Sequence, residues 1–225
     1  MSTLTAALPS GPARAGVVVL QEAFGITAHI RSILFRLRDA GYLAVAPHLF
    51  ESIGDPEIPY TDTDAAIAAA GTVERERLLA DVDASLDLLV RAGVPPARVG
   101  VIGFCMGGSA ALAVACHRDL GAAVTFYGGG ITKGRFGFAP LVDEVRGLRA
   151  PWLGLYGDLD PSIPTDEVEH LRTALTDSAQ DADIVRYAAA GHGFNCDARD
   201  SYEKDSAIDA WARTTAWLAH HLGVA

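Results

Sequence analysis

A cysteine between two glycines has the sequence setting of a catalytic nucleophile. Residues 99–104 read Val-Gly-Val-Ile-Gly-Phe, an apolar run typical of a buried strand, and residues 103–107, Gly-Phe-Cys-Met-Gly, lead into a helical segment. In this G-x-C-x-G pattern the central residue occupies a strained turn that only flanking glycines permit, as in the G-x-S-x-G nucleophile elbow. A thiol there lies at the positive end of a helix, which favours the thiolate. The pattern predicts Cys105 as a nucleophile; a buried structural cysteine is the alternative.

A cysteine nucleophile needs a base and a group that orients the base. His192 stands in a Gly-flanked loop, Ala-Gly-His-Gly-Phe, just after a late apolar run, and an earlier run that ends at Tyr156 is followed by Asp158 and Asp160. The chain order Cys, Asp, His is the order of α/β-hydrolase triads and differs from the orders in chymotrypsin and subtilisin. We expect Asp160 to orient His192, because it has the longer reach and precedes a Pro-bounded turn. Asp158 stays an alternative.

The other histidines offer few competitors for the role of base. His48 follows the apolar run that ends at Ala46, so it is the one rival to His192. The remaining five fall on or at the ends of predicted helices, where we expect solvated faces: His29, His117, His170, His220 and His221.

Glu22 adds a carboxylate at the end of an early strand, in Val-Val-Val-Leu-Gln-Glu. Ligands of open α/β sheets bind in the crevice at the carboxyl ends of the strands, so Glu22 and the turn that follows it could face the same crevice as Cys105. A buried Glu22 beside Cys105 would raise the pKa of the thiol and oppose the helix dipole. Alternatively, Glu22 merely begins a loop. The backbone N–H of Met106 is placed to hold a developing oxyanion.

Short apolar runs alternate with segments of helical period along the chain. This alternation predicts an α/β fold, with a mostly parallel central sheet and helices on both faces. Two segments, 47–64 and 128–150, show neither period and should be surface loops near the site, and residues 1–15 should be a weakly ordered lead-in. The expected strands are 16–20, 42–46, 99–104, 122–127, 152–156 and 183–187, and the expected helices are 29–40, 72–92, 107–117, 166–175 and 202–222.

Size and composition indicate one globular domain, which we expect to span residues 1–225. Hydrophobic residues make up 50% of the 225 and charged residues 20%. A chain of this size can bury a large enough core to fold without disulfides or a structural metal. The three cysteines are an odd number without CxxC spacing, so we expect free thiols and no metal site. No Walker, dinucleotide or HExxH pattern occurs, so we expect no cofactor.

The charge pattern argues against large charged or membranous partners. The net charge is −10, and no cluster of Lys and Arg could neutralise a run of phosphates, so nucleic acid is not an expected partner. No apolar stretch approaches the length of a membrane span, and the first residues lack a signal peptide pattern. We therefore expect a cytoplasmic protein, a monomer or small homo-oligomer, that acts on a small molecule.

These motifs together resemble the dienelactone hydrolase family, thiol members of the α/β-hydrolase superfamily. The resemblance runs from about Gly16 to Leu222. It implies hydrolysis of a lactone or ester through an acyl-enzyme, as in a carboxymethylenebutenolidase, with Cys105 as nucleophile, His192 as base and Asp160 as its orienter. It also implies that Glu22 holds the cysteine until substrate displaces it, and that the N–H groups of Ala23 and Met106 form the oxyanion hole. The matching segments are Gln21–Gly25, Ala46–Phe50, Gly103–Gly108, Tyr127–Gly129, Gly157–Pro164 and Gly191–Phe194.

The chain departs from the family pattern at a substrate-binding position. Members that cleave dienelactones hold the substrate carboxylate with arginines, one of them four residues after the catalytic His, where this chain has Cys196; Arg199 is near but out of step. A general carboxylesterase or thioesterase with the same triad is therefore an alternative, and a non-catalytic binding protein on the same fold is another. The first strands of the fold should also be short or absent, because only 15 residues precede Gly16.

Overall fold

The computed structural model describes residues 3–224 and is built around a seven-stranded sheet in the order β1-β3-β2-β4-β5-β6-β7. Six strands run parallel, and only β1 is antiparallel to its neighbour. The expected α/β fold with a mostly parallel sheet is thereby confirmed. The strands are β1 (Leu4–Ala7), β2 (Ala15–Leu20), β3 (Tyr42–Pro47), β4 (Val99–Phe104), β5 (Ala122–Phe126), β6 (Trp152–Gly157) and β7 (Ala182–Tyr187).

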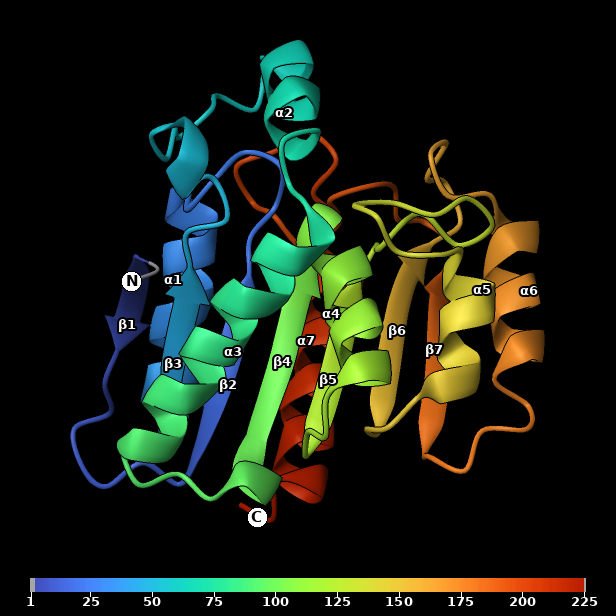
Figure 1. Ribbon diagram of the computed structural model, residues 1–225. Helices are drawn as coiled ribbons and strands as arrows, with labels where there is room; N and C mark the ends of the chain where they lie inside the picture. The colour runs from blue at the N-terminus through green and yellow to red at the C-terminus, as the bar shows by residue number, and fades with distance from the viewer. Residues whose placement is uncertain (1–2, 225) are drawn as a thin grey trace.

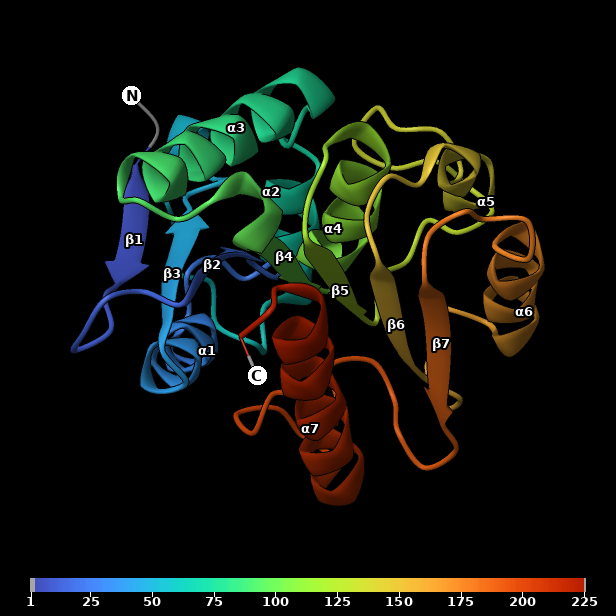
Figure 2. The same ribbon diagram turned by 90° about the horizontal axis from the view of Figure 1, so that it is seen from below.

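Helices cover both faces of this sheet (Figures 1 and 2). On one face α1 packs on β2 and β3, and α7 packs on β5 and β6; on the other face α3 packs on β2 and β3, and α4 packs on β4 and β5. The central strands are therefore buried on both sides, which is why they read as continuous apolar runs. The helices are α1 (Ala28–Asp39), α2 (Thr63–Ala70), α3 (Arg75–Arg91), α4 (Met106–His117), α5 (Leu141–Glu144), α6 (Thr165–Ala174) and α7 (Lys204–His221).

The strand order places the crevice for a ligand beside β2. From β2 the chain passes to β3 on one side, and then returns through α3 to β4 on the other side. Ligands in open α/β sheets bind at such a switch point, outside the carboxyl ends of the strands. Glu22 follows β2 and Cys105 follows β4, so the sequence-predicted residues meet at this edge of the sheet.

Two predictions about the first half of the chain are wrong. Residues 1–15 are not merely a lead-in, because β1 pairs with β3 from Leu4↔Pro47 to Ala7↔Ala44. The short run Leu-Thr-Ala-Ala carries little apolar alternation, and pairing at the edge of a preformed sheet decides its conformation. The segment before α3 also contains a separate helix, α2, and α3 itself begins at Arg75 rather than at residue 72.

Helix α2 escaped prediction because its sequence, Thr-Asp-Ala-Ala-Ile-Ala-Ala-Ala, has almost no hydrophobic period. Alanine has the highest helix propensity but contributes little to an apolar stripe. The Asp62 side chain caps the helix by accepting a hydrogen bond from the Ala65 backbone N–H at 3.1 Å. In Figure 1, α2 stands above the carboxyl end of the sheet. The predicted loop 128–150 likewise contains a short helix, α5.

Within residues 3–224 no helix is both long enough and apolar enough to cross a bilayer.

Candidate active site

Cys105 occupies the strained turn that its sequence pattern predicts. Its backbone has φ 53° and ψ −115°, a conformation that costs a non-glycine residue on the order of 1–3 kcal/mol. The flanking glycines make the turn possible: a Cβ on Gly103 would lie 1.8 Å from the Gly107 carbonyl oxygen, and a Cβ on Gly107 would lie 2.2 Å from the Leu20 carbonyl oxygen. The Cys105 N–H donates to the Phe126 carbonyl at 3.0 Å, which ties the turn to the end of β5.

Three predicted residues form a continuous chain of contacts from three loops. The Nε2 atom of His192 lies 3.0 Å from the Cys105 sulfur, and its Nδ1 atom lies 2.6 Å from Oδ2 of Asp160. The Asp160 side chain is 1% exposed and that of His192 is 23% exposed. In this arrangement the buried carboxylate orients the imidazole through one ring nitrogen, and the other ring nitrogen is placed to take a proton from the thiol.

The structure separates the two candidate carboxylates after β6. Asp160 contacts His192 and is held by Ser162, whose backbone N–H and hydroxyl donate to Oδ1 at 2.8 and 2.6 Å. Asp158 instead accepts a hydrogen bond from the Arg186 guanidinium at 2.7 Å. Ser162 was not singled out from the sequence, although a serine two residues after an aspartate is a common partner in such turns.

The pKa values of the pair are shifted in the directions that favour a thiolate beside an imidazolium. Burial raises the pKa of Cys105, but the charge and hydrogen bond of His192, together with the Met106 N–H, lower it below the usual value. Burial lowers the pKa of His192, and the opposing effects of Cys105 and Asp160 raise it to about 10. The Glu22 charge acts against the thiolate, as expected for a buried carboxylate at that position.

The lowered pKa of Cys105 predicts that its thiolate reacts at a lower pH than that of an ordinary thiol. As the pH falls through the lowered pKa of Cys105, the thiolate is protonated and its alkylation slows. Loss of the His192 proton near pH 10 removes the acid that a leaving group needs, but the sulfur stays a thiolate. We therefore expect the rate of iodoacetamide alkylation at Cys105, measured by intact mass against time, to reach half of its maximum at a pH below the value of about 8.5 for an ordinary thiol. A rate that keeps rising to a midpoint near pH 8.5, as for an ordinary thiol, would contradict the ion pair.

Glu22 is buried and surrounded by donors that the sequence did not predict. Its carboxylate accepts hydrogen bonds from the Tyr60 hydroxyl at 3.3 Å and the Tyr127 hydroxyl at 3.5 Å, and Arg199 Nη1 lies 3.6 Å from Oε1. The Cys105 sulfur is directed to His192 rather than to this carboxylate. Tyr127 also lies against the His192 ring, with 5.2 Å between ring centroids, so one residue touches both parts of the site.

The backbone around the predicted oxyanion hole joins the ends of two strands. Gly107 N–H donates to the Gln21 carbonyl at 3.1 Å, which holds the first turn of α4 against the segment after β2. Ala23 and Met106 therefore belong to two chain segments that meet beside Cys105. Ala23 also borders a cavity of about 480 Å³ whose other walls come from α2 and the segment 135–137.

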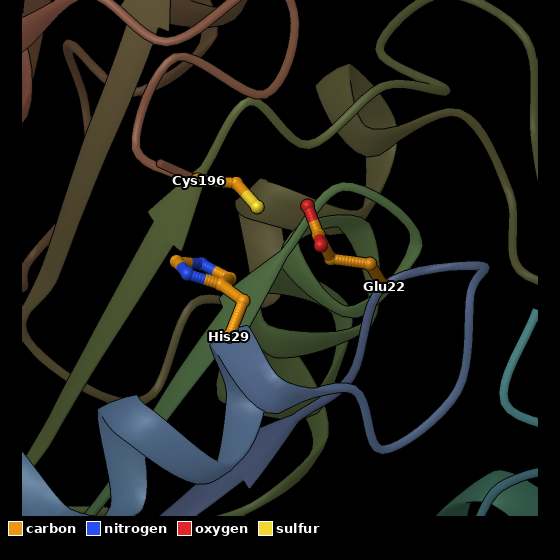
Figure 3. A group of neighbouring side chains, drawn as sticks. All are labelled: Glu22, His29 and Cys196. Atoms are coloured by element: carbon orange, nitrogen blue, oxygen red, sulfur yellow. The ribbon is translucent and has the colours of Figure 1, made fainter. Parts of the chain in front are cut away.

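A second cluster lies behind Glu22. Figure 3 shows the Cys196 sulfur and the Glu22 carboxylate facing one another, with the His29 ring beside them at the start of α1. One potential ligand atom of each residue lies within 4.8 Å of the others. A metal fits this cluster poorly, because the Arg199 guanidinium already stands at the Glu22 carboxylate and two tyrosine hydroxyls donate to it. We assign the cluster to the packing around Glu22.

The structure also decides between the histidines. Of the two candidates for the base, His192 contacts Cys105, whereas His48 is engaged elsewhere, with Nε2 2.9 Å from the Thr5 hydroxyl and Nδ1 3.2 Å from Asp55. The expectation that His29 lies on a solvated face is wrong: it is 6% exposed, and its ring meets Phe104 edge-on. Burial lowers the pKa of His29.

The fold is that of an α/β-hydrolase: a mostly parallel sheet with a strained turn at Cys105 after one strand and His192 and Asp160 on later loops. The family model described as "Dienelactone hydrolase family" matches residues 3–222. The chain belongs to this family and is a carboxylic ester hydrolase of its kind.

Named relatives agree with this assignment. A protein from Escherichia coli O157:H7 named as a carboxymethylenebutenolidase is 40% identical over 211 residues, covering 92% of this chain and 77% of its own length. A protein of the same name from Yersinia pestis is 38% identical over 208 residues, covering 91% and 78%. A crystal structure named as a dienelactone hydrolase from Klebsiella pneumoniae superposes with a TM-score of 0.85 at 36% identity and covers 96% of this chain and 99% of the other.

Proposed function

We propose that this enzyme hydrolyses small carboxylic esters or lactones through an acyl-enzyme on Cys105. The thiolate attacks the carbonyl carbon, and the resulting oxyanion accepts hydrogen bonds from the N–H groups of Ala23 and Met106. As the carbon–oxygen bond breaks, His192 gives its proton to the leaving oxygen. Water then attacks the thioester, His192 takes a proton from it, and the acid leaves with the thiolate restored. Asp160 keeps His192 oriented and stabilises its charged form.

The contact chain Cys105–His192–Asp160, at 3.0 and 2.6 Å, is the observation that carries this proposal. A non-catalytic binding protein would have no need for a thiol in a strained turn with an imidazole at hydrogen-bond distance. We assign Glu22 the role of a modulating carboxylate. Its charge opposes the thiolate, and its position between Tyr60, Tyr127 and Arg199 determines how strongly that charge is felt at Cys105.

Two arginines bear on the substrate. Arg199 already pairs with the Glu22 carboxylate, so a substrate carboxylate would have to share its guanidinium group with Glu22. Arg135 lines the cavity beside Ala23 and is exposed. It therefore offers a cation to an anionic lactone, whereas the largely apolar wall opposite favours neutral esters. A general carboxylesterase is accordingly the second candidate function.

The intact mass of the enzyme, measured during turnover of two substrates, tests the proposal. Wild-type enzyme would be mixed with a dienelactone and, separately, with nitrophenyl acetate, and its intact mass recorded during turnover. We expect release of product from at least one substrate and a transient mass increase equal to the acyl group, located at Cys105 by peptide mapping. Turnover with an acyl group on any other residue, or no turnover of either substrate, would refute it. A preference for the neutral ester would select the general esterase.

The remaining expectations stay proposals. We propose a single-domain enzyme that uses no metal or organic cofactor, because acyl transfer through Cys105, His192 and Asp160 requires none. A cytoplasmic location suits a thiol nucleophile and two further unpaired cysteines, Cys116 and Cys196. A monomer or small homo-oligomer without nucleic acid or membrane partners is consistent with the net charge of −10.

A further inference from the structure

The cavity that borders Ala23 has walls that suit an apolar group. Helix α2 and the turn after it contribute Ile67, Ala70 and Val73, and Phe136 stands in the wall formed by the segment 135–137. Its volume of about 480 Å³ is within the range of small-molecule sites, which are mostly apolar with a few polar groups. Arg135 is the charged residue of the lining, at the edge that faces the solvent.

Ile67 is a large apolar residue that α2 exposes to the solvent instead of burying. Its residue surface is 64% exposed although α2 buries Ala66 and Ala69 on its other side. A single exposed isoleucine is ordinary, but this one lines the cavity together with Val73 and Phe136. Contact with an apolar ligand would remove its surface from water, which is favourable by roughly 25 cal/mol for each Å².

Phe136 is held in the cavity wall against its own backbone preference. Its φ is 54°, in the left-handed region, and Gly137 follows with φ 76°. Bulky residues rarely adopt this conformation, and strained residues of this kind cluster at ligand sites. A glycine at position 136 would fit the backbone better, so the phenyl ring has a role that the turn itself does not require.

The cavity reaches the site through Ala23 rather than through His192. Ala23, whose N–H is the proposed oxyanion donor, lines it, whereas Cys105, Met106, His192 and Asp160 do not. A leaving oxygen must lie near His192 to receive its proton. The part of the substrate that extends away from His192 past Ala23 is therefore the acyl part.

We propose that this cavity is the acyl-binding subsite, which accepts a neutral alkyl or aryl group of short to medium length, and that Ala70 and Phe136 set the length. This inference rests on the proposed ester hydrolysis and adds to it the substrate class. Ala70, the last residue of α2, and Phe136 both line the cavity, from two different segments of the chain.

Filling the cavity with one larger side chain tests the proposal. Nitrophenyl acetate, butyrate, hexanoate and octanoate would be compared with wild type, Ala70→Leu and Ala68→Leu. Ala68 is exposed on the same helix and does not line the cavity, so it is the matched control. We expect Ala70→Leu to lower kcat/KM for butyrate and hexanoate by about tenfold or more relative to acetate, since each methylene in a pocket is worth about tenfold or more in selectivity. Ala68→Leu should match wild type.

A complementary variant removes the ring. Phe136→Gly should shift the preferred ester toward longer chains, and its Tm should be unchanged or higher because glycine relieves the positive φ. A merely structural phenyl ring would instead give a lower Tm and equal losses on all four esters.

Three outcomes would overturn the subsite. Equal loss on all esters in Ala70→Leu, with an unchanged Tm, would mean that position 70 does not set the length of the acyl group. No change of chain-length preference in either variant would place the acyl group elsewhere. A change seen only when the alkyl group is moved to the alcohol side, in a series of alkyl acetates, would assign the cavity to the leaving group. Failure of wild type to cleave any ester would count against the proposed function instead.

Discussion

Replacing Cys105 with alanine should abolish ester hydrolysis while leaving the fold intact. The proposed mechanism has no other group that can form the acyl bond, and removal of a nucleophile from such a triad reduces kcat by about 10⁴-fold or more. Alanine also fits the small space of the turn, although the positive φ of 53° remains a strain. We would measure kcat/KM for nitrophenyl acetate with enzyme free of wild-type contamination, together with the Tm.

Cys116 provides a matched control for this substitution. It lies in α4, eleven residues after Cys105, is 6% exposed, and burial raises the pKa of its thiol to about 12. It is therefore a protonated, unreactive thiol at neutral pH. Cys116→Ala should keep wild-type kcat/KM within about twofold, with at most a small loss of Tm from lost packing. A Cys105→Ala enzyme that retains more than about one hundredth of wild-type activity would show that another residue carries the reaction.

The nucleophile elbow could be predicted from sequence because its determinants are local. Gly103 and Gly107 are needed at fixed positions around Cys105, since a Cβ on either would collide with backbone oxygens. Asp160 and His192 were predictable for a related reason: each follows a parallel strand, and parallel strands bring their carboxyl ends to one edge.

The surroundings of Glu22 could not be predicted in the same way. Tyr60 lies in a segment without hydrophobic period, and it reaches Glu22 only because α2 and the loop before it fold over the sheet. Arg199 is seven residues past His192. No regular spacing in the sequence predicts its ion pair with Glu22, which lies 177 positions earlier. Such contacts depend on loop paths, which are set by tertiary packing rather than by local propensity.

The sequence favours one of the two carboxylates after β6, and the structure separates them by their partners. Reach along the loop favoured Asp160, but Asp158 stays a possibility until the side chains are placed. The structure pairs Asp158 with Arg186 and Asp160 with His192. The decisive residues are therefore the partners, Arg186 on β7 and His192 beyond it, whose positions follow from the pairing of β6 with β7.

Asp160→Asn should lower kcat/KM by about 10³- to 10⁴-fold without unfolding the protein, as the loss of the carboxylate does in serine-protease triads. The amide is nearly the same size but is neutral, and its NH₂ group would favour the wrong tautomer of His192. Because Asp160 helps to raise the pKa of His192, we also expect the alkaline limb of the pH profile to move below its position near pH 10. The measurement is kcat/KM for nitrophenyl acetate between pH 5 and 11.

Asp158→Asn is the control, because it removes a charge two residues away that contacts Arg186 and not His192. The Asp158 and Arg186 side chains are 27% and 30% exposed, so loss of their ion pair should cost about 1 kcal/mol or less in folding stability. Its pH profile should match wild type, since His192 keeps Asp160. If instead the Asp158 variant lost activity and shifted the alkaline limb while Asp160→Asn stayed active, the orienting carboxylate would be Asp158, and the 2.6 Å contact to His192 would have no catalytic role.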